Sequence, residues 1–206
     1  MAQRATDCER GLAWDETSRT TLFHDRFITI DSSSFSLPDG SEAGPYYLYS
    51  THDSVSIIPV TKDGQIVCVR QFRPGVARVI LELPAGGIDE KDVADALAGE
   101  SHAEVVAAAA RELREETGYV ARELRYLGGV LLHATVSRDV NHCVLALGCE
   151  RVGDQQLDPT EFLHVELVSP DELDALVHAG EFQQLSHAHA WLRWGRRARA
   201  SEGGAR

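Results

Sequence analysis

The clearest structural signal in this chain is one long helical stretch set among short strands. From about Ala103 to Thr117 the sequence is dominated by alanine, glutamate, arginine and leucine, which favour helix, and Gly118 follows as a helix-terminating glycine. Two further helices are expected, one opening at Ser169 and one over 184–199. Strands are expected at about 20–49, 55–60, 66–69, 79–83, 130–132, 143–147 and 162–168. This order of strands, helix, strands and helices predicts a mixed α/β (α+β) sandwich rather than regular βαβ repeats.

Length and composition fit one globular domain with an added N-terminal segment. Of the 206 residues, 43% are hydrophobic and 25% are charged, which is typical of globular proteins. We expect a β-rich N-terminal segment at 1–52, a main domain at 53–200 and a disordered tail at 201–206. The sequence has neither an apolar run long enough to span a bilayer nor an apolar signal core near its start, so we expect a cytoplasmic protein without a membrane partner.

The acidic charge balance restricts the partners further. The chain carries 20 Lys and Arg against 32 Asp and Glu, a formal net charge of −12. Such a field repels nucleic acid and anionic lipid, so neither is an expected partner. A small anionic substrate would need metal ions or a local arginine cluster to offset the carboxylates.

Three glutamates of the long helix point to metal chemistry. Glu112 lies three and four residues before Glu115 and Glu116, so the three carboxylates share one face of the helix. Like charges this close repel unless they are neutralised, and hard divalent cations such as Mg²⁺ or Mn²⁺ prefer such oxygen ligands. The alternative is a solvated helix face on which Arg111 and Arg114 form the salt bridges.

The neighbouring motifs favour the metal site. Arg111-Glu112-Leu113-Arg114-Glu115-Glu116-Thr117-Gly118-Tyr119 resembles the second half of the Nudix box, GX5EX7REUXEEXGU, where U is a bulky apolar residue. Upstream, the segments 81–87 (LELPAGG) and 69–74 (VRQFRP) are similar to the ELPAG and QFR motifs of the ADP-ribose and nucleotide-sugar pyrophosphatases of that family. The resemblance covers about residues 53–119. It implies a Nudix α/β/α sandwich with a mixed sheet, preceded by an N-terminal antiparallel β segment.

The chain departs from the family pattern before the helix. Gly86 and Arg111 are 25 positions apart, eleven more than in the pattern, which indicates an insert within about 89–101. Eight positions before Arg111, where the first glutamate of the pattern belongs, stands Ala103. We favour Glu100 as the replacement, because it follows a glycine as in the family and a loop can move it into place; Glu104 is the other nearby acid.

The resemblance implies roles around the metal. Glu112 and Glu116 would be the main ligands, with Glu115 as a third ligand or an orienting group. The family also implies metal coordination by the backbone carbonyl of Ala85. Arg111 would pair with a carboxylate of the helix and hold it in place.

The resemblance also implies roles around the substrate. Arg73 would grip the diphosphate, since guanidinium makes forked contacts with phosphate. Arg70 is a weaker candidate on the same strand, and Glu82 would contact the terminal sugar. Glu161, in a late loop, is the expected residue for orienting or deprotonating water, with Asp158 as the alternative. Arg138 lies in the stretch expected to form the substrate loop.

Together these features predict an enzyme. The expected reaction is Mg²⁺-dependent hydrolysis, with Mn²⁺ as the alternative metal, of a nucleoside diphosphate linked to another group. ADP-ribose is the first substrate expected, and a UDP- or ADP-sugar is the second. The resemblance of segment 1–52 to the dimerisation sheet of this branch implies a homodimer. Two alternatives stay open: a non-catalytic module that senses nucleotide sugars, and a nucleoside triphosphate pyrophosphatase of the same fold.

Overall fold

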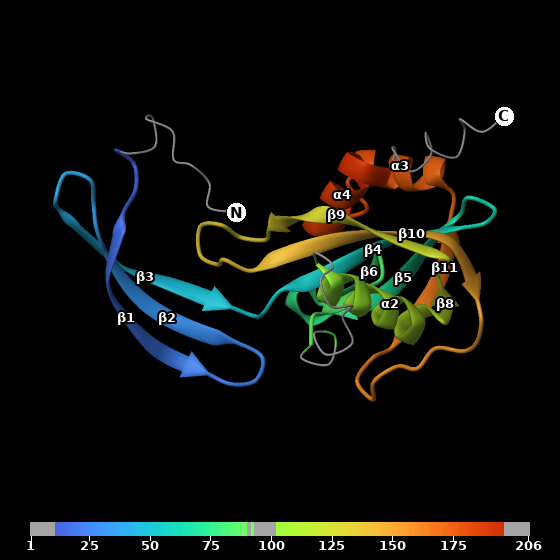
Figure 1. The fold of residues 1–206 in the computed structure, drawn as a ribbon, viewed down its shortest axis with the longest axis horizontal. Helices are drawn as coiled ribbons and strands as arrows, with labels where there is room; N and C mark the ends of the chain where they lie inside the picture. Colours follow the sequence, from blue (N-terminus) through green and yellow to red (C-terminus); the bar gives the residue numbers. More distant parts are fainter. Residues whose placement is uncertain (1–10, 90–91, 93–101, 196–206) are drawn as a thin grey trace. The chain divides into compact units, whose positions relative to one another are not determined.

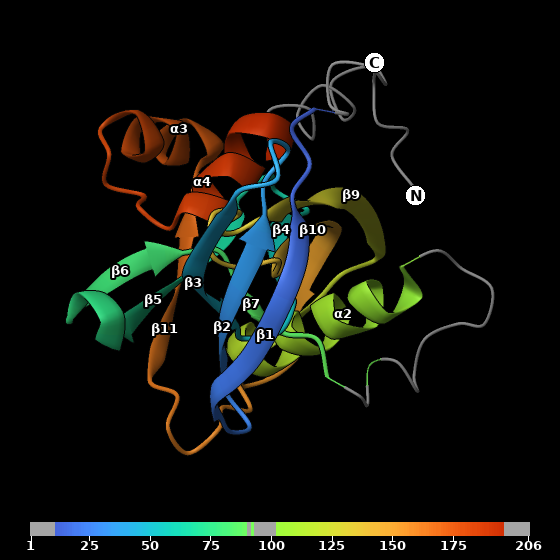
Figure 2. The same ribbon diagram turned by 90° about the vertical axis from the view of Figure 1, so that its left-hand side faces the viewer.

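Three antiparallel strands form the N-terminal sheet of the computed structural model, which describes residues 11–89, 92 and 102–195. They are β1 (Asp15–His24), β2 (Thr29–Ser36) and β3 (Glu42–Ser50), in the order β1-β2-β3. A turn at 38–40 joins β2 to β3. This sheet and the segment Leu131–Asp139 make one compact unit, the N-terminal unit, and Asp53–Val130 with Val140–Arg206 make a second, the main unit. Figure 2 shows the three strands side by side.

Segment Leu131–Asp139 is attached to the N-terminal unit by the Asp139 carboxylate and by the Val136 carbonyl, which accepts from the Tyr49 amide at 2.9 Å. Asp139 is almost fully buried and accepts hydrogen bonds from the Ser50 hydroxyl (2.6 Å) and the Thr51 amide (2.6 Å). The backbone amide of Asp139 donates to the Ser137 hydroxyl at 3.0 Å. These contacts join parts of the chain almost ninety positions apart, which no local sequence pattern signals.

A mixed sheet forms the centre of the main unit, with the strand order β11-β5-β4-β10-β8. Strand β10 runs parallel to β4, whereas β5 runs antiparallel to β11, β4 and β6, and β7 runs antiparallel to β4. The remaining strand, β9, pairs with β10. The strands are β4 (Ser54–Thr61), β5 (Ile66–Arg73), β6 (Arg78–Glu82), β7 (Ala85–Gly87), β8 (Tyr119–Val120), β9 (Glu123–Leu131), β10 (Val140–Arg151) and β11 (Leu163–Val168).

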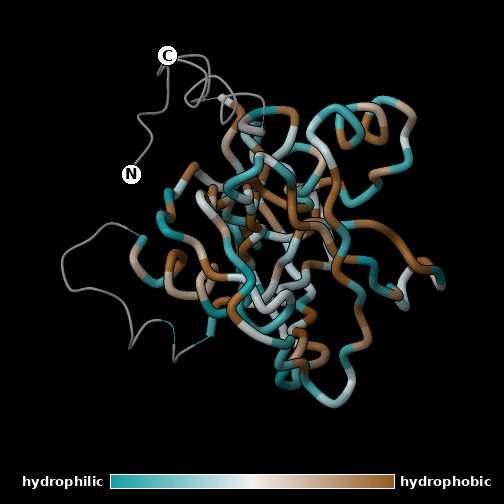
Figure 3. Tube along the Cα trace, turned by 90° about the vertical axis from the view of Figure 1, so that its right-hand side faces the viewer, coloured by the Kyte–Doolittle hydropathy of each residue, from teal (hydrophilic) through white to brown (hydrophobic). Residues whose placement is uncertain are grey.

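Helices cover both faces of this sheet. On one side lies α2 (Ala103–Thr117), and on the other lie α3 (Pro170–His178) and α4 (Leu185–Ala190), as Figure 1 shows. Ile57 and Ile58 of β4 are both fully buried, because successive side chains of a strand point to opposite faces. Ile57 packs in the cluster under α2 and Ile58 in the cluster under α3 and α4, so hydrophobic residues gather on the central strands (Figure 3). The expected mixed α/β sandwich is confirmed.

The expected helix ends are also confirmed where the chain is described. Helix α2 has the predicted bounds, and Gly118 caps it with φ +75°, a conformation that favours glycine. The Ser169 hydroxyl accepts from the Glu172 amide at the start of α3. The last expected helix, 184–199, corresponds to α4 and a following π-helical turn, Trp191–Gly195, while 196–199 lie outside the described residues. No helix in the described part of the chain is long and apolar enough to cross a membrane.

Candidate functional site

Two buried glutamates of α2 form the centre of the candidate site. Glu112 and Glu116 are 9% and 3% exposed and lie one helical turn apart, facing β7. One oxygen of Glu116, Oε2, accepts a hydrogen bond from the Ala85 amide at 3.1 Å. Burial raises the pKa of Glu116 to about 8, and the nearby charges of Glu112 and Glu161 act in the same direction. Burial also raises the pKa of Glu112, against the opposing effect of Arg111.

Strand β7 brings the backbone of the ELPAG segment onto these carboxylates. It pairs with β4 through Ser56↔Ala85 and Val55↔Gly86. A Cβ atom at Gly86 would overlap the carboxylate of Glu112, so the glycine allows the strand backbone to approach the helix. Ala85, Glu112 and Glu116, which the sequence assigned to one metal site, therefore lie together.

Arg111 connects the glutamates to one another. Its Nη1 donates to Glu112 Oε1 at 2.6 Å and to Glu115 Oε2 at 3.1 Å, as expected for an orienting arginine. Its Nη2 also donates to the Gly87 carbonyl at 2.9 Å. Glu115 is more exposed than the other two glutamates, so the structure places it at the rim of the cluster, bound to Arg111.

The principal partner of Arg111 is a residue that the sequence reasoning missed. Arg111 Nε and Nη2 form a forked pair with the two oxygens of Asp92, each at 2.9 Å. Asp92 is 2% exposed, and the Asp89 amide donates to its Oδ2 at 2.7 Å. Hydrogen bonding to Asp92 is the largest cause of the raised pKa of Arg111.

The missed residue had a signal in the sequence. Counting back from Arg111 leads to Ala103, but counting forward six positions from Gly86, as the GX5E part of the pattern requires, leads to Asp92. The added residues then follow this acid rather than precede it. Glu100, the residue favoured from the sequence, lies outside the described residues.

Glu161 lies close enough to the cluster to affect it electrostatically. Its charge raises the pKa values of both Glu112 and Glu116. The carboxylate accepts from the Asp158 amide at 3.0 Å, and the Glu161 amide donates to the Asp158 carbonyl at 2.9 Å. Asp158 thus supports the turn that carries Glu161.

The loop that ends in this turn is anchored on the C-terminal end of α2. The amides of Val152 and Gln156 donate to the carbonyls of Gly118 (2.9 Å) and Glu115 (2.8 Å). The Gln155 side chain donates to the Glu116 carbonyl at 2.6 Å. These bonds satisfy helix-terminal carbonyls and fix the start of the Glu161 loop.

Gly118→Ala should therefore loosen both the helix end and the loop. A Cβ at Gly118 would overlap the backbone carbonyl oxygen of Gly153, and the residue holds a left-handed conformation. We expect a loss of about 2–3 kcal/mol in the free energy of unfolding, or about 5–10 °C in the midpoint of thermal unfolding. Gly64→Ala is the matched control, since Gly64 is also left-handed but has open space around its Cβ position. Equal losses in the two variants would contradict the steric argument.

Arg73, which is partly exposed, forms an ion pair with the buried Glu82 beside the cluster. Arg73 Nε donates to Glu82 Oε2 at 2.7 Å, and the charge of Arg73 acts on the pKa of Glu116. Glu82 is fully buried, and its Oε1 accepts no hydrogen bond from the residues that the structure describes. In this conformation Glu82 orients Arg73. Arg70 lies on the opposite face of β5 from Arg73. Its Nε is 2.5 Å from Oε2 of Glu166 on β11, with which it forms an ion pair.

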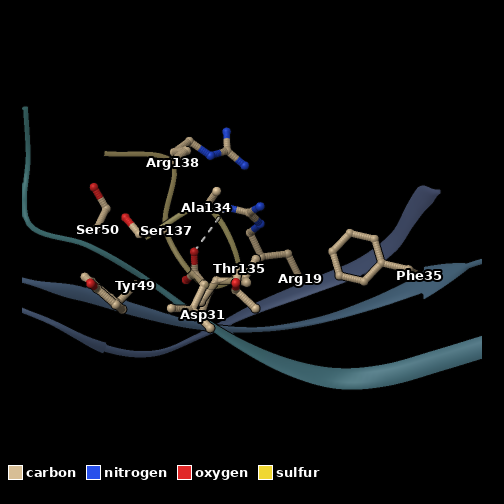
Figure 4. Close-up of a pocket in the computed structure, with 11 residues that line it drawn as sticks. Arg19, Asp31, Phe35, Tyr49, Ser50, Ala134, Thr135, Ser137 and Arg138 are labelled. Atoms are coloured by element: carbon tan, nitrogen blue, oxygen red, sulfur yellow. Dashed lines mark hydrogen bonds and ion pairs between the residues drawn. The ribbon is translucent and has the colours of Figure 1, made fainter. Parts of the chain in front are cut away.

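Arg138 belongs to the N-terminal unit. There it lines a cavity of about 370 Å³ together with Arg19, Asp31, Phe35 and Tyr49 (Figure 4). Arg19 donates to Asp31 Oδ2 at 3.2 Å, the pair marked by the dashed line. Arg138 is exposed at this cavity, within the segment that Asp139 attaches to the sheet.

The donor set of the cluster fits a hard divalent cation. No three acidic, histidine or cysteine side chains converge as a closed metal cage within the described ranges. Mg²⁺ does not need such a cage, because it keeps several waters and is commonly held by one or two carboxylates and by substrate phosphates. Glu112, Glu116 and the Ala85 carbonyl would supply the protein oxygens. Such an ion would neutralise the two buried carboxylates, whose pKa values are raised by burial.

Comparisons with known proteins identify the family. Residues 50–190 match the NUDIX domain family. The ADP-ribose pyrophosphatase of Bacillus subtilis (strain 168) is 28% identical over 84% of this chain and 88% of that protein. The ADP-sugar pyrophosphatase of Mus musculus is 33% identical over 65% of this chain and 61% of that protein.

A solved structure shows the same fold. The crystal structure of an ADP compounds hydrolase superposes with a TM-score of 0.74 and 21% sequence identity, over 93% of this chain and 96% of that chain. The family match spans the ELPAG segment, the acidic face of α2 and the Glu161 loop. The chain is therefore a member of the Nudix hydrolase family.

Proposed function

We propose that this enzyme hydrolyses ADP-ribose to AMP and ribose 5-phosphate, with a UDP- or ADP-sugar as the next substrate. The observation that carries the proposal is the convergence of Glu112, Glu116 and the Ala85 backbone, with Glu161 close by. The names of the two pyrophosphatase relatives support ADP-ribose and ADP-sugars as the substrate class.

Different residues of the chain would have different roles in this reaction. Arg73 would bind the diphosphate, and Glu82 would keep its guanidinium aimed at the cluster. Glu161 would orient the attacking water or take its proton. Water adds to one phosphorus as the bridging P–O bond breaks, so one product leaves as AMP and the other as ribose 5-phosphate. Mg²⁺, or Mn²⁺, held by Glu112 and Glu116 would neutralise the diphosphate and the charge that develops on it.

A homodimer is part of the proposal. Trp14, Phe35 and Tyr46 pack edge to face or tilted on the N-terminal sheet, with ring centroids 5.7–6.1 Å apart. Trp14 and Tyr46 are still 47% and 39% exposed. An aromatic surface of this kind is typical of a protein–protein interface. We expect light scattering to give twice the 22.6 kDa chain mass, and a Tyr46→Asp variant to shift toward the monomer.

A substrate panel tests the proposed activity. The protein is incubated with ADP-ribose, UDP-glucose and 8-oxo-dGTP, with and without Mg²⁺, and products are separated by chromatography. We expect metal-dependent release of AMP from ADP-ribose as the fastest reaction. Faster turnover of 8-oxo-dGTP would indicate a triphosphate pyrophosphatase, and binding of the nucleotide sugars without turnover would indicate a sensor module. The same panel with Glu116→Gln excludes a contaminating hydrolase.

A further inference from the structure

A fully buried histidine contacts the connection within the ELPAG segment that leads to Ala85. His187 of α4 is 2% exposed, and its Nδ1 accepts a hydrogen bond from the Leu83 amide at 3.2 Å. Leu83 is fully buried and stands in the connection between β6 and β7. None of the roles assigned above involves His187, which belongs to no motif recognised in the sequence.

The Leu83 amide is a group that needs this acceptor. The connection leaves β6 after Glu82 and joins β4 at Ala85, and Pro84 between them has no N–H to donate. A buried amide without an acceptor costs about 1–3 kcal/mol. His187 therefore supplies the acceptor for the Leu83 amide, which the strand pairing of β6 and β7 does not provide.

The same connection is held from the opposite face of the sheet. The Ala85 amide donates to Glu116 of α2, while the Pro84 carbonyl accepts from the Ile57 amide at 2.9 Å. Helix α4 thus fixes one end of a three-residue segment, and α2 fixes the other. Any shift of Leu83 would move the Ala85 backbone, because only Pro84 lies between them and its ring restricts the backbone.

The charge state of His187 suits an acceptor. Burial, and then the nearby charge of Arg73, lowers its pKa to about 3. The ring is therefore neutral in ordinary buffers, with the proton on Nε2 and a lone pair on Nδ1 that faces the Leu83 N–H.

We propose that His187 is a positioning residue for the metal site: its Nδ1 fixes the Leu83 amide and so sets the Ala85 backbone against Glu116. This proposal rests on the metal-ligand assignment of the proposed function. It makes the C-terminal helix α4 part of the catalytic architecture, although no atom of that helix needs to touch substrate.

Three substitutions separate positioning from packing. His187→Asn keeps an acceptor oxygen near the position of Nδ1, whereas His187→Gln places its oxygen near Nε2. His187→Leu keeps bulk and removes the acceptor. We expect the Gln and Leu variants to bind Mn²⁺ about tenfold or more weakly by electron paramagnetic resonance, as for other groups that orient metal ligands. The Asn variant should stay within about threefold of the parent protein.

Two further readouts go beyond stability. Hydrogen exchange of the Leu83 amide should accelerate in the Gln and Leu variants and stay slow in Asn. At saturating metal, kcat should fall with KM nearly unchanged. If the Leu variant does not fold, the Asn and Gln pair still decides the question, because both side chains are polar. Equal Mn²⁺ affinity in Asn and Gln would overturn the proposal.

The metal-ligand assignment, on which this proposal rests, has a separate control. If Glu116→Gln binds Mn²⁺ as the parent protein does, the metal-ligand assignment itself fails. If Glu116→Gln loses Mn²⁺ and His187→Gln keeps it, only the role of His187 fails.

Discussion

Glu116→Gln should give a folded protein whose kcat is about a thousandfold lower than that of the parent. The amide keeps an oxygen that can accept from the Ala85 amide but loses the charge that holds a divalent cation. Charge stabilisation by a catalytic metal contributes several kcal/mol, and a loss of about 4 kcal/mol corresponds to about a thousandfold in rate. The measurement is steady-state hydrolysis of ADP-ribose across a range of Mg²⁺ concentrations. Activity within tenfold of the parent would contradict the ligand assignment.

The same variant should be more stable than the parent when metal is removed. Burial raises the pKa of Glu116 to about 8, whereas the ordinary pKa of a glutamate side chain is 4.5. The unfolded chain therefore loses this proton at lower pH than the folded protein does. Stability of the parent falls as the pH rises from about 4.5 to about 8, and glutamine has no proton to lose.

Thermal unfolding with and without Mg²⁺ measures the difference in stability between Glu116→Gln and the parent. In EDTA the advantage of Glu116→Gln should grow with pH through that window and persist above it. In excess Mg²⁺ the parent should gain stability and the variant should gain little, because only the parent binds the ion well. A variant that melts below the parent in EDTA at pH 9 would show that Glu116 is not held in a buried, unfavourable charged state.

Local signals predicted much of the molecule. The bounds of α2 follow from helix-forming residues and one terminal glycine, and strands β4 and β5 coincide with the apolar runs expected at 55–60 and 66–69. The meeting of Ala85 with Glu112 and Glu116 was predicted by motif resemblance, and the structure places the three together. These features depend on residues near one another in the chain or on motifs in a fixed order.

Contacts between distant residues could not be predicted in the same way. Asp139 joins segment Leu131–Asp139 to β3 through Ser50, and His187 meets Leu83 more than a hundred positions away. A lone aspartate or histidine carries no periodicity that would indicate its partner. Glu82 was expected to contact a sugar, but burial and its bond to Arg73 could be known only from the packed structure.

Asp92→Ala is the second substitution with a large expected effect. Its carboxylate holds Arg111 through two hydrogen bonds, and Arg111 in turn holds Glu112 and Glu115. Removing Asp92 leaves part of the guanidinium without an acceptor and frees it to rotate away from Glu112. Loss of such an orienting group costs about 10- to 100-fold in activity or metal affinity. Breaking a buried ion pair costs about 3–5 kcal/mol in stability.

The controls use acids on both sides of Asp92. Asp89→Ala removes a carboxylate that is 56% exposed and 3.6 Å from Arg111, so its activity should stay within about twofold of the parent. Asp92→Asn keeps acceptor geometry without the charge and should fall between Asp92→Ala and the parent. Glu100→Gln tests the residue favoured from the sequence. If Glu100→Gln loses activity while Asp92→Ala keeps it, Glu100 replaces the first acid of the box and Asp92 only supports the loop. If the reverse holds, the chain has kept the first acid of the box at its distance from Gly86 and lengthened the stretch between that acid and α2.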